Sequence, residues 1–354
     1  MGIWYCTREE VQESLLEGYN SRSVSLIDRR IEASSRGIEE TTLHRRFYPE
    51  IRTVSFDWPD FLIQEPTWEL DLGRHEMVSV TSVVSGGDTI DPSKYFLRRR
   101  DALDEPPYTH LELDLGTNAA FSIGSTHQKS LVVTGLFCYK IDEEPTALLA
   151  TSCNSTTTNL TVKPNSGLFG IGVGSLIRIG TERINVTHRS MTTTSQTLQS
   201  ALTDSQSDTA VSVTDGTAYA VGEIILLDSE RMRIEDIAGN TLIVERAADG
   251  SVLASHTGST IYARRLLTVE RGVLGTTAAS HDADDTIEVF RFPQLVTELA
   301  IAETVNMLEN RLAGYARTVG TGDNQRESTG RGVVELRKLA FLAHGRNKVR
   351  AGAV

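Results

Sequence analysis

The sequence VGSLIRIGTERI at residues 173–184 recurs as VGEIILLDSERM at residues 221–232. Each copy contains a valine-glycine corner, a short apolar strand, a turn and a second strand that begins near a Glu-Arg pair. A second repeat follows, LIVER at 242–246 and LTVER at 267–271, and each of its copies precedes a histidine, His256 or His281. The two repeats predict β structure within a part of the chain that is rich in serine and threonine.

The order of the repeats along the chain is first half, first half, second half, second half. This order indicates nesting, with an inner copy at about 208–263 inserted into an outer copy formed by 155–190 plus 266–292. A tandem array would instead alternate the halves. Insertion at a loop whose ends lie close together is physically easy.

Helices are expected at both ends of the chain. Thr7 and Glu10 form a capping-box pattern that opens a first helix. Residues 24–43 carry apolar side chains at helical spacing, and Pro293 is well placed as a first helical residue. The stripe expected to be buried on the helix after Pro293 consists of Leu295, Leu299, Ala302, Val305, Leu308 and Leu312.

Between the first helices and the repeats, residues 51–149 contain short alternating segments such as 78–84 and 131–135 that favour strands. We therefore expect an α+β fold, with a helical body from both chain ends, a small β region and an inserted all-β decoration of two nested modules. The expected parts are a helical part at 1–50, a β part at 51–149, the decoration at 150–292, a core helix with a flexible break at 293–330 and a basic tail at 331–354.

The charge is distributed unevenly along the chain. The 354 residues carry a net charge of −12, whereas residues 331–354 contain six basic side chains and one acidic side chain. The tail therefore carries +5 and the rest of the chain −17. An acidic body argues against general nucleic-acid binding. A short basic tail is typical either of a docking segment for an acidic surface or of a solvated terminus.

Signatures of catalysis and of cofactor binding are missing from the sequence. No phosphate-binding loop, serine-hydrolase elbow or zinc-protease motif occurs, and the three cysteines form no CxxC pair. We expect no enzyme activity, no catalytic residue, no metal and no cofactor. His256 and His281 recur at equivalent places, so we expect each to hydrogen-bond a loop. The sequence also shows no secretory signal and no apolar run of about 18 residues, so no membrane contact is expected.

The ends of the chain resemble the head-to-tail adaptor (connector) proteins of long-tailed double-stranded DNA bacteriophages. The similarity lies in a helical pair that begins at Tyr5 and closes with HRRFYP at 44–49, and in the strands near 70–73, 78–87 and 108–113. It continues in VVTGLFCY at 132–139, where Cys138 replaces a more usual glycine, and in STGRG at 328–332 before the basic tail. The segment LTVERGVLGT at 267–276 resembles β modules of phage structural proteins.

The resemblance implies a structural virion protein at the capsid vertex or neck, assembled in the host cytoplasm. It would form a homo-oligomeric ring, usually of twelve copies, beneath the portal protein, join the capsid to neck and tail-completion proteins, and continue the DNA channel without sequence-specific binding. The tail would then dock on the portal. The basic and apolar residues implied in that docking are Arg331, Leu336, Arg337, Lys338, Leu339, Phe341, Leu342, Arg346, Lys348 and Arg350.

Two other interpretations remain open at this point. A surface or tail decoration protein with glycan-binding β modules would need sugar affinity in 150–292, and the aromatic content of 6% argues against it. An enzyme would need a polar cluster in a concave site, and no residue can be nominated for one.

Overall fold

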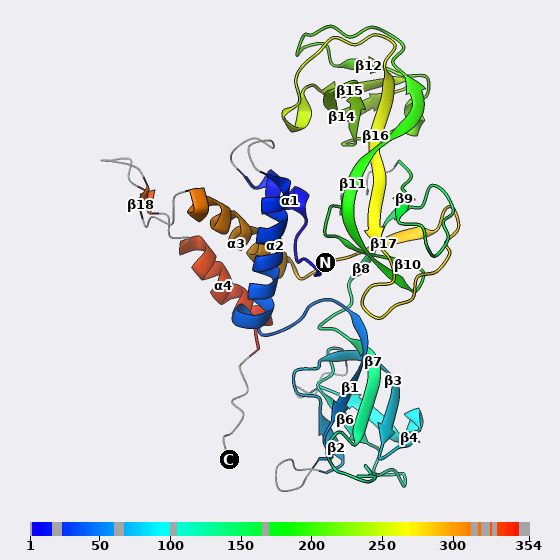
Figure 1. Cartoon of the computed structure of the whole chain (residues 1–354), viewed down its shortest axis with the longest axis vertical. Coiled ribbons are helices and arrows are strands. Elements are labelled where there is room, and N and C mark those ends of the chain that lie inside the picture. The colour runs from blue at the N-terminus through cyan, green and yellow to red at the C-terminus, as the bar shows by residue number, and fades with distance from the viewer. Residues whose placement is uncertain are drawn as a thin grey trace. The chain divides into compact units, whose positions relative to one another are not determined.

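A computed structural model describes residues 2–15, 23–59, 67–99, 105–164, 170–312, 318–319, 326–327 and 331–346 (Figure 1). The chain divides into two compact units. The first unit comprises residues 1–43, 143–273 and 277–345, and the second comprises residues 44–142, 274–276 and 346–354. Each unit is described by itself below.

The expected helical body with a small β region is wrong. Strands account for 37% of the residues and helices for 22%. Antiparallel sheets of ten, four and three strands dominate the fold, and the described residues include four α-helices. Many of the strands have only three to five residues. Such short segments carry too few residues for a clear periodic pattern, so the sequence understates the strand content of the fold.

The α-helices of the first unit come from both ends of the chain. They are α1 (Arg8–Glu13), α2 (Val24–Gly37), α3 (Gln294–Leu312) and α4 (Arg331–His344). The capping box of α1 is formed as expected, because Thr7 Oγ1 accepts the Glu10 N–H at 3.2 Å and Glu10 Oε2 accepts the Thr7 N–H at 2.7 Å. A π-helical turn, η1 (Ile38–Thr42), extends α2.

The buried face of α3 differs from the predicted stripe. Leu299 and Leu308 are buried as expected, but Leu295, Ala302 and Val305 are only partly buried, and the side chain of Leu312 lies outside the described residues. The reason is that α3 packs against both α2 and α4, so its contacts extend beyond one apolar stripe. Among the α3 side chains that the structure describes, the buried ones are Val296, Leu299, Ala300, Glu303, Thr304 and Leu308.

The ten-stranded sheet of the first unit has the order β12-β15-β14-β13-β16-β11-β10-β17-β8, with β9 also paired to β16. Its strands are β8 (Glu143–Leu148), β9 (Asn159–Thr161), β10 (Leu176–Ile179), β11 (Glu182–Thr197), β12 (Ala210–Ser212), β13 (Ile224–Leu227), β14 (Glu230–Ala238), β15 (Thr241–Glu245), β16 (Thr260–Glu270) and β17 (Thr286–Phe290).

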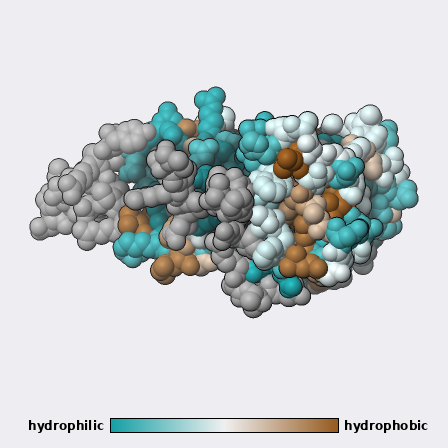
Figure 2. Space-filling view, turned by 90° about the horizontal axis from the view of Figure 1, so that it is seen from below, coloured by the Kyte–Doolittle hydropathy of each residue, from teal (hydrophilic) through white to brown (hydrophobic). Residues whose placement is uncertain are grey.

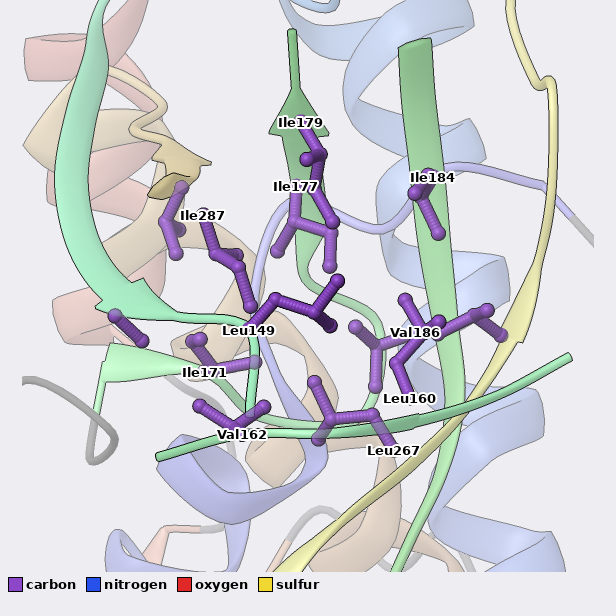
Figure 3. Close-up of a cluster of buried hydrophobic side chains, with 13 residues drawn as sticks. Leu149, Leu160, Val162, Ile171, Ile177, Ile179, Ile184, Val186, Leu267 and Ile287 are labelled. Carbon is purple, nitrogen blue, oxygen red and sulfur yellow. The ribbon is translucent and has the colours of Figure 1, made fainter. Parts of the chain in front are cut away.

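Two separate hydrophobic cores lie along this sheet. We define the outer module as residues 143–190 with 266–290, and the inner module as residues 191–265. The outer core includes Leu149, Ile177, Val186 and Leu267 (Figure 3). The inner core includes Val211, Ile225, Ile234 and Ile261 among its members. Strands β11 and β16 are long enough to contribute to both modules, which they connect as a paired ribbon.

The strand pairings of the two modules correspond one to one. In the outer module β10 pairs with β11 and β17, and in the inner module β13 pairs with β14 and β16. The pairing of β9 with β16 likewise corresponds to that of β12 with β15. In the inner module, the first part of β16 takes the place of β17 and the last part of β11 takes the place of β8. The inner module is therefore inserted into the β11–β16 hairpin of the outer module.

The second unit contains the four-stranded sheet β1-β7-β3-β4 and the three-stranded sheet β2-β6-β5, which share one hydrophobic core. Exposed apolar residues on the face in Figure 2 are interspersed among polar ones, as is ordinary for a protein surface. The strands are β1 (Glu50–Phe56), β2 (Glu69–Asp71), β3 (Met77–Ser85), β4 (Asp88–Ile90), β5 (Tyr95–Arg98), β6 (His110–Leu113) and β7 (Leu131–Phe137); the two-residue strands β18 (Thr318–Val319) and β19 (Arg326–Glu327) pair with each other in the first unit.

Candidate functional site

Each β module contains a buried glutamate surrounded by donors. In the outer module, Glu182 accepts two hydrogen bonds from Arg271, from Nε and Nη2, each at 2.7 Å. It also accepts the backbone N–H groups of Gly272 at 2.9 Å and Ala279 at 3.0 Å, and His281 Nε2 lies 2.8 Å from its Oε2. The hydrogen-bond acceptor sites of this carboxylate are therefore all occupied by donor groups of its own module.

The inner module repeats this cluster almost atom for atom. Glu230 accepts from Arg246 Nε at 2.7 Å and Nη2 at 2.8 Å, and from the N–H groups of Ala247 at 2.9 Å and Ala254 at 3.0 Å. His256 Nε2 lies 2.9 Å from Glu230. We call each set an E-R-H cluster, namely Glu182, Arg271 and His281 in the outer module and Glu230, Arg246 and His256 in the inner one.

The arginine of each cluster also fixes the loops around it. Arg271 donates to the carbonyl groups of Asn154 at 3.1 Å, Thr157 at 2.9 Å and Ala279 at 2.6 Å. Arg246 donates to the equivalent carbonyl groups, whose distances are 3.2 Å to Thr203, 2.9 Å to Asp208 and 2.7 Å to Ala254. Asn154 and Thr203 lie in loops outside the repeated segments. Arg271 and Arg246 therefore each connect such a loop to the β-hairpins of their own module.

Hydrogen bonding keeps both glutamates ionised. Burial alone raises the pKa of Glu182, but the hydrogen bonds from Arg271, Ala279, His281 and Gly272 outweigh burial and lower the pKa from 4.5 to about 2. The pKa of Glu230 is lowered to about 2 for the same reasons, with Arg246 and His256 as its side-chain donors. A carboxylate that is saturated with donors and remains charged is suited to holding loops together rather than to transferring protons.

The two histidines take part in these clusters. The backbone of His281 pairs with Cys153 and that of His256 with Leu202, each through two hydrogen bonds of 2.9–3.0 Å. The expected loop contact is present, but the sequence reading missed the glutamate that each ring faces. The recurrence of Glu, Arg and His in both copies was the signal that could have revealed the cluster.

The predicted docking residues lie mainly on α4, which packs against α3. Ala340 is fully buried, and Arg337 Nε donates to the buried carboxylate of Glu303 at 2.7 Å. Arg337, one of the predicted portal contacts, is therefore already paired within its own chain. Leu336 and Phe341 are half-buried on this helix.

The other side of α4 is exposed and mixes apolar with charged side chains. Leu339 and Leu342 are 55% and 81% exposed, and Lys338 is paired only with Glu335 of the same helix, at 2.8 Å, among the contacts of the described residues. We call this surface, formed by Val334, Glu335, Lys338, Leu339 and Leu342, the exposed face of α4.

The remaining docking residues are placed as follows. Arg331 begins α4, although its side chain is outside the described residues. Arg346 Nη1 lies 3.7 Å from the carboxylate of Glu76. Lys348 and Arg350 lie outside the described residues.

The anchoring of α4 continues through the other helices. Ser34 Oγ of α2 donates to the Ala300 carbonyl of α3 at 3.1 Å, so the two ends of the chain meet within the first unit. Within the described part of the chain, no group of three or more His, Cys, Asp or Glu residues could hold a metal ion. No helix among those residues is long and apolar enough to cross a membrane.

No family model, curated protein or solved structure matches the chain.

Proposed function

We propose that the chain is a structural virion protein, a head-to-tail adaptor that forms a ring beneath the portal and continues the DNA channel toward the neck and tail. The observation that carries this proposal is the exposed face of α4. A basic helix that is fixed to the rest of its unit, while Leu339 and Leu342 remain in solvent, is suited to binding another protein.

Three further features support a structural role. The helices from the two chain ends pack together, so the basic helix α4 is attached to a folded part of its unit. The E-R-H clusters direct their charged groups inward at their own loops. The acidic remainder of the chain reduces its attraction for DNA, because few basic groups are available to release counterions from phosphates.

The proposed partner surface combines apolar pockets with acidic groups. Leu339 and Leu342 would enter the pockets, and Lys338 would meet carboxylates at the rim, where charge contributes more to orientation and association rate than to affinity. The portal protein is the partner implied by the sequence resemblance. In this proposal the β modules are directed away from the channel, toward neighbouring capsid or neck proteins.

Cross-linking mass spectrometry of the native particle tests the proposal. We expect lysine-reactive cross-links from Lys338 to a portal subunit. Cross-links from Lys338 only to tail-tip or fibre proteins would contradict the adaptor role. Lys163, a lysine of the outer module that is 38% exposed and paired with Asp284, serves as the internal control, since the proposal places no portal contact there.

A further inference from the structure

The N-terminal segment binds a corner of the outer module, at residues 172–175. The Arg8 N–H donates to the Val173 carbonyl at 3.0 Å, and Glu9 Oε2 accepts the Val173 N–H at 2.8 Å. The Trp4 ring packs so closely over Gly174 that a side chain at this position would clash with it. Val173 itself is only 1% exposed.

The inner module has the same corner, at residues 220–223. The Gly174 N–H donates to the Val186 carbonyl at 2.8 Å, and the Gly222 N–H donates to the Ile234 carbonyl at 2.5 Å. Both glycines have a positive φ, +99° and +79°. In each corner the fourth residue donates its N–H to the carbonyl of the first at 3.2 Å. The backbone conformation that binds the N-terminal segment at residues 172–175 therefore occurs a second time at residues 220–223.

The corner of the inner module is uncovered. Val221 is 47% exposed, in contrast to the buried Val173 at the equivalent place. Among the hydrogen bonds of the described residues, which include the whole inner module, none engages the Val221 N–H or carbonyl group. An exposed valine beside a free peptide group offers apolar contact together with one donor and one acceptor.

We propose that the corner formed by Ala220, Val221, Gly222 and Glu223 docks a helix-initiating segment of a partner protein. That segment supplies a backbone N–H to the Val221 carbonyl, a Glu or Asp carboxylate to the Val221 N–H, and an apolar side chain that packs over Gly222 as Trp4 packs over Gly174. The chemistry of this occupant is that of Trp4, Arg8 and Glu9 on the equivalent outer corner.

The occupant is not the N-terminal segment of a second copy. Ala220 stands where the outer module has Gly172, and a Cβ at Gly172 would lie 2.7 Å from Thr7 Cβ and 2.6 Å from Glu9 Oε2. Contacts below 3.0 Å require one of the atoms to move. The Glu9 carboxylate ends a flexible side chain and can shift, whereas Thr7 Cβ is fixed by its backbone. The Ala220 methyl group therefore selects a segment with glycine, which has no Cβ, at the N-cap position.

Peptide titrations of the full-length chain test this proposal. The probes are two synthetic peptides that copy residues 2–15, one native and one carrying Thr7→Gly, and a glycine N-cap lowers helix stability only slightly. Binding is followed by the amide NMR signals of Val221 and Gly222 in the labelled chain. We expect the Thr7→Gly peptide to shift both signals and the native peptide to bind about tenfold more weakly, because relieving an overpacked methyl contact has an effect of this order.

Two controls use the same readout. In the Ala220→Gly chain the native peptide should bind as well as the Thr7→Gly peptide binds the wild type. In a Val221→Glu chain, neither peptide should shift the Gly222 signal, since the added carboxylate repels that of the peptide. Unshifted Val221 and Gly222 signals with both peptides at millimolar concentration would overturn the proposal. Equal binding of both peptides to the wild-type chain would identify a second copy as the occupant and also overturn it.

Discussion

Glu230 and Arg246 are both completely buried, and Oε1 of the glutamate lies 2.7 Å from Nε of the arginine. The glutamate comes from the first repeated half of the inner module and the arginine from the second. The equivalent pair of the outer module, Glu182 and Arg271, is formed by residues 89 positions apart in the chain. Each pair therefore connects the two halves from which its module is built.

Loss of the buried arginine should destabilise the inner module strongly. Arg246→Met leaves Glu230 charged and buried without its main donor, and breaking one side of a buried ion pair costs about 3–5 kcal/mol. Urea unfolding measures the effect. Arg233→Met is the matched control, because Arg233 pairs with Glu245 at 3.9 Å at a half-exposed site, where about 1 kcal/mol or less is expected. Equal losses in the two variants would contradict a structural role for the E-R-H cluster.

Stability should fall in acid because of the same glutamates. The pKa values of Glu182 and Glu230 are about 2 in the folded chain and 4.5 ordinarily. A lowered folded-state pKa contributes stability that is fully present above pH 4.5 and is lost as the pH falls toward 2. The slope of the unfolding free energy against pH measures this effect. Between these pH values, Glu230 takes up a proton when the chain unfolds. The Glu230→Gln variant should lack this proton uptake and show a smaller slope. An unchanged slope would contradict the lowered pKa of Glu230.

Removal of the inner module should leave the outer core folded. Ser190 of β11 pairs with Leu266 of β16, so residues 191–265 can be replaced by an Asn-Gly turn that closes a two-residue hairpin. Hydrogen exchange should show unchanged protection at Ile177, Ile184 and Val186, which belong to the outer core. Rapid exchange throughout residues 176–186 would show that the outer module depends on the inner one.

Gly174→Ala should detach the N-terminal segment from its corner. The substitution combines a strained φ of +99° with a clash against the Trp4 ring. Gly180→Ala is the matched control, because its φ of +58° is also positive but no atom lies within 4 Å of the added Cβ. We expect about 1–2 kcal/mol of destabilisation in the control and about 1–3 kcal/mol more at Gly174. Equal thermal shifts in the two variants would contradict the role of Trp4.

If the proposed adaptor function holds, charged substitutions on the exposed face of α4 should prevent attachment to the portal. Leu339→Glu with Leu342→Glu leaves the buried contacts of Ala340 and Arg337 in place, so the chain should still fold. Co-sedimentation with portal assemblies measures attachment, with an expected loss of tenfold or more. The control is Val252→Glu, a valine of the inner module that is 78% exposed. Attachment that survives the double substitution would reject the exposed face of α4 as the docking surface.

Patterns among residues that lie close together in the sequence predict the local structure well. The capping box of α1 depends on residues three positions apart and was recognised from Thr7 and Glu10. The repeated halves could be aligned because the valine-glycine corners and the Glu-Arg pairs recur. The β content was underestimated, since strands such as β9 and β12 have three residues and carry no measurable periodicity.

Long-range partners could not be predicted in this way. The charge of the tail predicts an acidic partner for Arg337. Counting charges does not show that Arg337 Nε lies 2.7 Å from Oε1 of Glu303, 34 positions earlier in the same chain. The predicted buried face of α3 is wrong for a related reason, because contacts with α2 and α4 bury residues outside a single stripe. The sequence places Glu182 and Arg271 in the two halves of one predicted module, but no sequence pattern predicts that the folded hairpins bring their side chains within hydrogen-bond distance.

The β14–β15 hairpin of the inner module ends at Gly239 and Asn240, between the paired residues Ala238 and Thr241. This tip is equivalent to the place where the outer module received its insertion. A gene duplication directed to the same tip would add a third module and leave both chain ends in their helices. An appendage built in this way can gain reach by one module at a time during evolution, while the attachment of the protein stays unchanged.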